Sequence, residues 1–147
     1  MQGKLKCLLF IVCCVLLASS YAQSAMSLFD EFKKEQQWDA KLQLGNVLLT
    51  NQNTSKKERA EIYSSMANLA LSVDNYTGAL EYFKLLEQGT SVSFLPNEHF
   101  RAIKMQGVAL FYQGHFQKAI VAYTRTLAIA EKNELLLEQA NLLNNIG

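Results

Sequence analysis

The stretch QGVALFYQGHFQKAIVAYTRTLAIA, from Gln106 to Ala130, decides the fold. Gly107 is small where two helices must approach each other closely, and Gly114-His115 supplies a sharp turn, because glycine accepts backbone angles that other residues avoid. After the turn, apolar residues return at helical spacing and form one face. These residues are Phe116, Ala119, Ile120 and Tyr123. The stretch therefore predicts two amphipathic helices folded back on each other.

The same pattern occurs forty residues earlier. A shift of forty residues places DNYTGALEYF (residues 74–83) over GHFQKAIVAY (residues 114–123). Residues of the same kind then coincide: Ala67 with Gly107, Leu71 with Phe111, Tyr76 with Phe116, Ala79 with Ala119, Leu80 with Ile120, and Phe83 with Tyr123. The register continues to the end of the chain, where Gly107 falls on Gly147 and Ile103 on Leu143. A fixed period of this size indicates a repeat architecture rather than one closed core.

The order of these residues resembles the tetratricopeptide repeat family. A small residue (Ala67, Gly107, Gly147) is followed by an aromatic residue (Tyr76, Phe116), an alanine (Ala79, Ala119) and a second aromatic residue (Phe83, Tyr123). The family repeat has about 34 residues, so the longer period here resembles the variety found in bacterial sensor proteins. The resemblance extends roughly from Lys56 to Gly147. It implies an all-α, right-handed superhelical solenoid of antiparallel helical hairpins.

The repeats are expected at about 56–95 and 96–135, with an incomplete repeat at 136–147. Ser55 and Glu58 form a capping box before a helix expected over residues 56–72. A second helix is expected over 76–88, then a loop over 89–95, and Pro96 begins the next helix. Residues 23–55 are predicted to form a degenerate N-terminal hairpin that caps the repeats, with its second helix over 38–49.

Residues 1–22 have the features of a secretory signal peptide. Lys4 and Lys6 precede an apolar run over residues 7–18, and small residues lead to a cleavage site after Ala22. The alternative is a retained anchor, but the run is shorter than the about twenty apolar residues that span a bilayer. We therefore expect an exported, periplasmic protein.

Cleavage would leave a chain without cysteine and close to electrical neutrality. Cys7, Cys13 and Cys14 all lie in the signal segment, so neither a disulfide nor a thiolate nucleophile is expected. Removing two lysines leaves twelve basic and thirteen acidic side chains. This balance predicts no binding of nucleic acid or of an anionic membrane surface.

The last fifteen residues, NELLLEQANLLNNIG, rebuild the first helix of another repeat. Without a second helix its apolar edge is expected to be exposed; this edge consists of Leu136, Leu142, Leu143 and Ile146. We therefore expect the sequence to be a fragment of a longer protein. The alternative is a final solvating helix, which would carry more charge than Asn141, Asn144 and Asn145 provide.

The residues that carry chemistry are few. His99 and His115 have no metal-binding spacing, and Glu134 and Glu138 are expected on a solvated face. No nucleophile elbow, phosphate loop or dinucleotide motif occurs, so no catalytic residue, metal or cofactor is predicted. Asn53 and Asn75 each begin a glycosylation acceptor triplet. Asn75 is better interpreted as a turn residue.

Binding is the stronger expectation. In the family, the first helix of each hairpin lines the concave face. The resemblance places these candidate groove residues there: Asn68, Leu71, Arg101, Lys104, Phe111, Tyr112 and Asn145, with Glu61, Ser64, Ser72, Val108, Asn141 and Asn144 beside them. Asparagine can bond to an extended peptide backbone, and Arg101 and Lys104 can pair with a carboxylate. One subclass of the family clamps a partner's terminal carboxylate; Lys104 and Asn145 occupy two clamp positions, but Val108 stands where an asparagine is needed.

Three functions follow from these expectations. The first is an exported scaffold that binds a protein or peptide in its groove. The second is the periplasmic sensory region of a membrane signalling protein, with a membrane span and a histidine kinase, diguanylate cyclase or DNA-binding output domain beyond residue 147; the phrases LAIAEKNE and LLNNIG resemble such sensor repeats. The third is a structural solenoid that self-associates.

Overall fold

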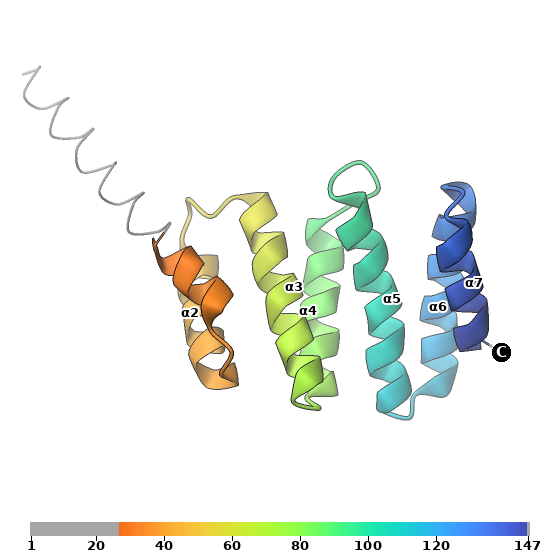
Figure 1. The fold of residues 1–147 in the computed structure, drawn as a ribbon, viewed down its shortest axis with the longest axis horizontal. Coiled ribbons are helices and arrows are strands. Elements are labelled where there is room, and N and C mark those ends of the chain that lie inside the picture. The colour runs from red at the N-terminus through yellow and green to blue at the C-terminus, as the bar shows by residue number, and fades with distance from the viewer. Residues whose placement is uncertain (1–26, 147) are drawn as a thin grey trace, which may run out of the picture. The chain divides into compact units, whose positions relative to one another are not determined.

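The structure, a computed structural model, describes residues 27–146 and is helical almost throughout (Figure 1). Residues 27–34 form a first helical segment. The others are α2 (Trp38–Thr50), α3 (Lys56–Ser72), α4 (Tyr76–Gly89), α5 (Pro96–Tyr112), α6 (Phe116–Lys132) and α7 (Leu136–Ile146). The described residues contain no strand, only an isolated bridge between Ser91 and Phe94. The predicted all-α class is confirmed, while the predicted signal peptide and its cysteines lie outside the described residues.

Contacts divide the chain into two units, Met1–Thr50 and Asn51–Gly147. In the described part of the first, Phe29 and Phe32 are buried and their rings stack with centroids 6.3 Å apart. Lys41 is also buried; its ammonium donates to the Glu35 carbonyl at 2.9 Å and lies 4.8 Å from the Phe32 ring centroid. Burial lowers the pKa of Lys41, and the nearby Glu35 charge opposes that shift.

In the second unit, side-chain caps fix where two helices begin. The Ser55 hydroxyl accepts from the Glu58 N–H at 3.2 Å, and the Glu58 carboxylate accepts from the Ser55 N–H at 2.8 Å. This reciprocal pair is the predicted capping box, and α3 begins directly after it. Asn75 caps α4 by accepting from the Gly78 N–H at 3.0 Å. Its interpretation as a turn residue is therefore confirmed.

Three of the connections in this unit have the same geometry. The turns at 73–75, 113–115 and 133–135 each contain a left-handed residue, which is Asp74, Gly114 or Glu134. The next residue then donates its N–H back into the helix: Asn75 to the Ala70 carbonyl at 2.8 Å, His115 to Leu110 at 2.9 Å, and Leu135 to Ala130 at 2.9 Å. These bonds satisfy carbonyls that a helix end leaves open. The fourth connection, residues 90–95, is longer and is built differently.

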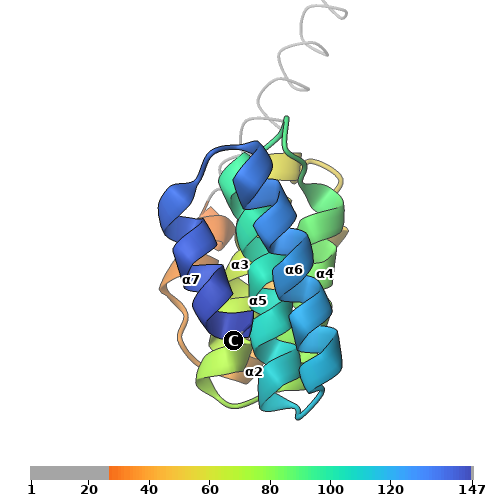
Figure 2. The same cartoon turned by 90° about the vertical axis from the view of Figure 1, so that its right-hand side faces the viewer.

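Neighbouring helices in this unit pack in sequence order, and α3 also contacts α5. Viewed from one end, α4 and α6 lie on one side, with α3, α5 and α7 towards the other (Figure 2). Gly107 lies where α5 meets α6, since a Cβ at this position would come within 2.5 Å of the Tyr123 ring. The close approach predicted from Gly107 is therefore confirmed.

Two predictions about the apolar faces were wrong. Leu142 was expected on an exposed edge but is fully buried in a cluster with Tyr123 and Ala130, because α7 packs against α6. Phe116 and Ile120 were expected on the packed face of their helix, but 55% and 36% of their surfaces are exposed. Leu136 and Leu143 are exposed, as expected.

Candidate functional site

A network of polar side chains connects α3, α5 and α7 in the second unit. We call it the polar ladder; it consists of Ser64, Asn68, Glu98, Arg101, Lys104 and Glu138. Arg101 on α5 donates to the Asn68 side-chain oxygen at 2.7 Å and to the Ser64 hydroxyl at 3.0 Å, both on α3. The same guanidinium lies 3.4 Å from the Glu98 carboxylate, one turn earlier on α5. A single arginine therefore joins two helices.

Lys104 extends the ladder to α7. Its ammonium donates to the Glu138 carboxylate at 2.9 Å and lies 5.6 Å from the centroid of the Phe100 ring. Glu134 and Glu138 were predicted to share a solvated face. Glu134 is exposed, as predicted, but the two side chains do not share one helix face. Glu134 lies in the turn before α7, and Glu138 is half-buried beside Lys104.

Two pockets flank the ladder. One, of about 410 Å³, lies between α3 and α5 and is bordered by Lys57, Glu61, Ser64, Asn68, Leu95 and Glu98, among others. The other, of about 470 Å³, is bordered by Arg101, Lys104, Asn133 and Glu138 and by apolar residues that include Phe100, Ile129 and Leu135. The ladder therefore places hydrogen-bond donors and acceptors beside apolar surface.

The residues predicted for one groove separate into two groups. Asn68, Arg101 and Lys104 come together in the ladder, but Phe111 and Tyr112 lie about 10–16 Å farther along α5 than Arg101 and Lys104, at about 1.5 Å per residue. There Tyr112 stacks on Tyr76 with ring centroids 5.1 Å apart, and Phe111 meets Phe116 edge-on at 5.3 Å. These four aromatic side chains form a cluster of their own, separate from the ladder. Helix α5 is long enough to carry both the ladder residues and, at its end, the aromatic cluster.

The remaining predicted residues are not part of the ladder. Leu71 is half-buried on α3, and Asn145 is exposed on α7. The structure shows no hydrogen bond between Asn145 and Lys104, whose ammonium is bound to Glu138. The two proposed clamp residues are thus not assembled into one carboxylate site.

Tyr76 in the aromatic cluster has a perturbed hydroxyl. It donates to the Asp74 carboxylate at 2.5 Å, and this hydrogen bond is the main reason that the pKa of Tyr76 is raised. Loss of the proton would remove the donor and place a phenolate beside a carboxylate. Tyr76 therefore remains protonated and a hydrogen-bond donor at neutral pH.

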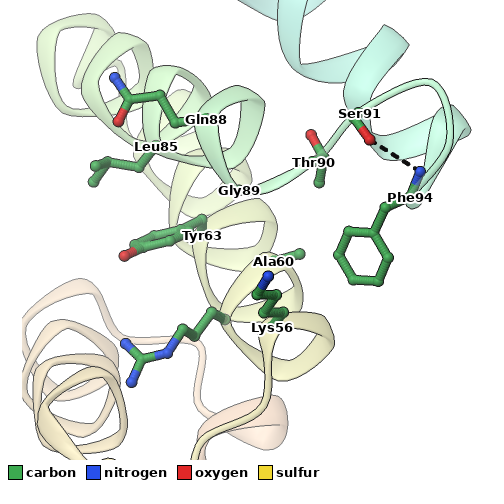
Figure 3. A pocket seen from close by; sticks show the side chains of 10 residues that line it. Lys56, Ala60, Tyr63, Leu85, Gln88, Gly89, Thr90, Ser91 and Phe94 are labelled. Carbon is green, nitrogen blue, oxygen red and sulfur yellow. Dashed lines mark hydrogen bonds between the residues drawn. The ribbon is translucent and has the colours of Figure 1, made fainter.

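A larger pocket, of about 840 Å³, was not foreseen from the sequence. We call it the loop pocket, because the connection at residues 90–95 forms one side of it. Figure 3 shows Lys56, Ala60 and Tyr63 from α3, Leu85 and Gln88 from α4, and Phe94 on the loop side. The sequence did predict a long loop at residues 89–95, and this loop could have pointed to the pocket, because loops often carry binding residues.

The described part of the chain offers neither a cluster of metal ligands nor a helix suited to a membrane. Residues 27–146 contain no group of three or more histidine, cysteine or acidic side chains placed to hold a metal ion. His99 lies with Nδ1 3.2 Å from the Thr90 hydroxyl, which explains its position at the start of α5 without a ligand. None of the described helices combines the length and apolar character needed to cross a membrane.

Comparisons of the chain with models of protein families, with curated proteins and with solved structures found no significant match. The resemblance to the tetratricopeptide repeat family therefore remains an expectation from the residues themselves.

Proposed function

We propose that this protein is an exported scaffold of the tetratricopeptide repeat type that binds an extended segment of a partner protein across the polar ladder. The single observation that carries the proposal is the placement of Arg101 and Lys104. Arg101 bonds to α3 and Lys104 bonds to α7, so one continuous polar surface extends over α3, α5 and α7.

The repeat arrangement is supported by the register of the helices. Helix α3 begins at Lys56, α5 at Pro96 and α7 at Leu136, which are forty residues apart in each case. Contacts between α3 and α5 bring equivalent helices of successive hairpins together. This is the packing expected when two-helix units stack in series and form a right-handed solenoid with one curved binding face.

The ladder has unused capacity for hydrogen bonds. A guanidinium has five N–H donors, and the bonds of Arg101 to Asn68, Ser64 and Glu98 occupy only some of them. Asn68 accepts from Arg101, which leaves its NH₂ group to bind a peptide carbonyl. The apolar side chains bordering the second flanking pocket, such as Phe100 and Ile129, would receive the partner's apolar side chains. The proposed ligand is therefore an extended peptide with acidic and apolar residues.

A charge reversal tests this assignment. Peptides that bind the whole chain would first be selected from a displayed library. The double variant R101E/K104E is expected to weaken their binding by about a hundredfold, because two charge-assisted contacts are replaced by repulsion. The variant K84E/K118E changes the same charge at exposed positions on α4 and α6, and it should leave the affinity unchanged.

Stability must be followed in parallel, because Glu at position 101 would face Glu98. The milder variant R101Q/K104Q avoids this repulsion and is expected to weaken binding by about tenfold while the circular dichroism spectrum stays helical. If the selected peptides bind both ladder variants as tightly as the original protein, the polar ladder is not the binding surface.

A further inference from the structure

The loop pocket exists because the two forty-residue repeats divide their length differently. Helix α4 has 14 residues and ends at Gly89, whereas α6 has 17 residues and continues to Lys132. Gly89 and Thr90 stand where the second repeat has Ile129 and Ala130, and glycine and threonine are poorer helix formers than alanine. The Thr90 hydroxyl also bonds to the Leu86 carbonyl at 2.7 Å, a group that one more helical turn would use.

A small side chain on α3 keeps the space beside the loop open. Ala60 borders the pocket, and the equivalent residue of the second repeat is Phe100, which is buried against its own hairpin. The loop is held in place by a pair of hydrogen bonds between Ser91 and Phe94, at 2.8 and 3.0 Å. Leu95 then adopts a left-handed backbone with φ of 55°, which is uncommon for a residue with a Cβ. The loop therefore has a defined shape around the pocket.

The lining of the pocket combines apolar walls with positive charge. Tyr63, Leu85 and Phe94 supply the walls, and Leu85 and Phe94 are each 38% exposed. Lys56 and Arg59 supply the charge, and none of the ten described residues that line the pocket is acidic.

The two cations differ in their freedom. Arg59 is fixed by donating to the backbone carbonyls of Thr54 at 3.2 Å and Asn51 at 3.0 Å. The ammonium of Lys56 is exposed and makes no hydrogen bond or ion pair with another described residue. A carboxylate is a natural partner for such a group, particularly where apolar walls reduce the competition from water.

We infer that the loop pocket binds a carboxylate attached to an apolar body, with Lys56 pairing with the carboxylate and Phe94, Leu85 and Tyr63 covering the apolar part. The volume of about 840 Å³ lies in the range typical of small-ligand sites. Two sources share this chemistry: a free organic acid, and the terminal carboxyl group of a partner peptide that ends in an apolar residue. This site is separate from the polar ladder and does not depend on the function proposed for it.

The experiment measures binding of three probes to the whole chain by isothermal titration calorimetry. The probes are decanoate, a decapeptide that ends in Leu-Phe with a free carboxyl group, and the same decapeptide with an amidated end. Binding of decanoate alone would identify a free acid, and binding of the free peptide alone would identify a partner's terminus; either supports the inference. The amidated peptide is expected to bind at least about tenfold more weakly than the free form.

Charge variants assign the binding to the pocket. K56E is expected to weaken binding of the carboxylate probe by about tenfold or more, and K84E is the matched control on the exposed side of α4. Lys56 is the first residue of α3, where a glutamate is favourable for the helix, so K56E should keep its fold. A second variant, F94A, should weaken binding through the apolar wall without any change of charge.

The inference is overturned if neither carboxylate probe binds, if the free peptide binds but the amidated peptide binds equally tightly, or if K56E and K84E have equal effects. Equal effects would show general electrostatic attraction rather than a pocket built around Lys56.

Discussion

The proposed repeats at residues 56–95 and 96–135 have the same length but divide it differently between helix and loop. Their helices begin at equivalent positions, Lys56 with Pro96 and Tyr76 with Phe116. In the second repeat, α6 is three residues longer than α4. In the first repeat, α4 ends earlier and the loop at residues 90–95 follows it. The helix starts therefore match between the two segments. The end of the second helix differs, and the loop pocket occupies the space that this difference creates.

The two hairpins also differ in the side chains that they bury. At equivalent positions on their first helices, the first repeat has Ala67, which is fully buried, and the second has Gly107, which lies against Tyr123. Phe83 and Tyr123 are equivalent residues, and both are buried. Burial also raises the pKa of Tyr123, because the charged form would lose its contact with water. In the second hairpin the Tyr123 ring therefore occupies the space that a methyl group at Gly107 would need.

The largest expected effect comes from emptying the core of the first repeat. Phe83 is fully buried, so F83A should lower the free energy of unfolding by about 3–5 kcal/mol. The control is F116A, which removes the same side chain at a site that is 55% exposed and should cost less than about 1 kcal/mol. Urea denaturation followed by circular dichroism measures both. Similar losses for the two variants would contradict the core that we describe.

A smaller effect tests the close approach in the second repeat. A Cβ added in G107A would lie 2.5 Å from the Tyr123 ring, so the free energy of unfolding should fall by about 1–3 kcal/mol. G89A is the control, because no atom lies within 4 Å of the Cβ that it would add, and its stability should not fall. The double variant G107A/Y123L should recover part of the loss, since the ring is removed. If G107A alone is as stable as the original protein, α5 and α6 do not approach as closely as described.

These comparisons show which features follow from local sequence and which do not. The starts of α3, α4 and α5 were predicted because Ser55 with Glu58, Asn75 and Pro96 act on the residues next to them. Burial depends on which neighbour covers a helix, and local periodicity does not contain that information. For this reason the assignments of Phe116 and Leu142 failed.

The candidate sites show the same limit. The family resemblance named Asn68 and Arg101 among the groove residues of two helices, and a hydrogen bond joins these side chains. It did not reveal that Tyr112 stacks on Tyr76 instead, because that contact depends on how the end of α5 packs against the start of α4. The loop pocket was missed because its residues come from α3, α4 and a connection whose shape is not repeated elsewhere in residues 51–146.

The smallest effect concerns the turns, which are the most similar parts of the two repeats. Gly114 has a φ of 77°, and its counterpart Asp74 adopts a φ of 56° despite having a side chain. G114A should lower the free energy of unfolding by about 1 kcal/mol, because a Cβ is disfavoured in the left-handed conformation. G114D should cost less than G114A, since aspartate tolerates this conformation better than alanine. Urea denaturation of the two variants measures the difference. If alanine is tolerated at 114 as well as aspartate, the two turns do not share the geometry that makes the repeats equivalent at this end.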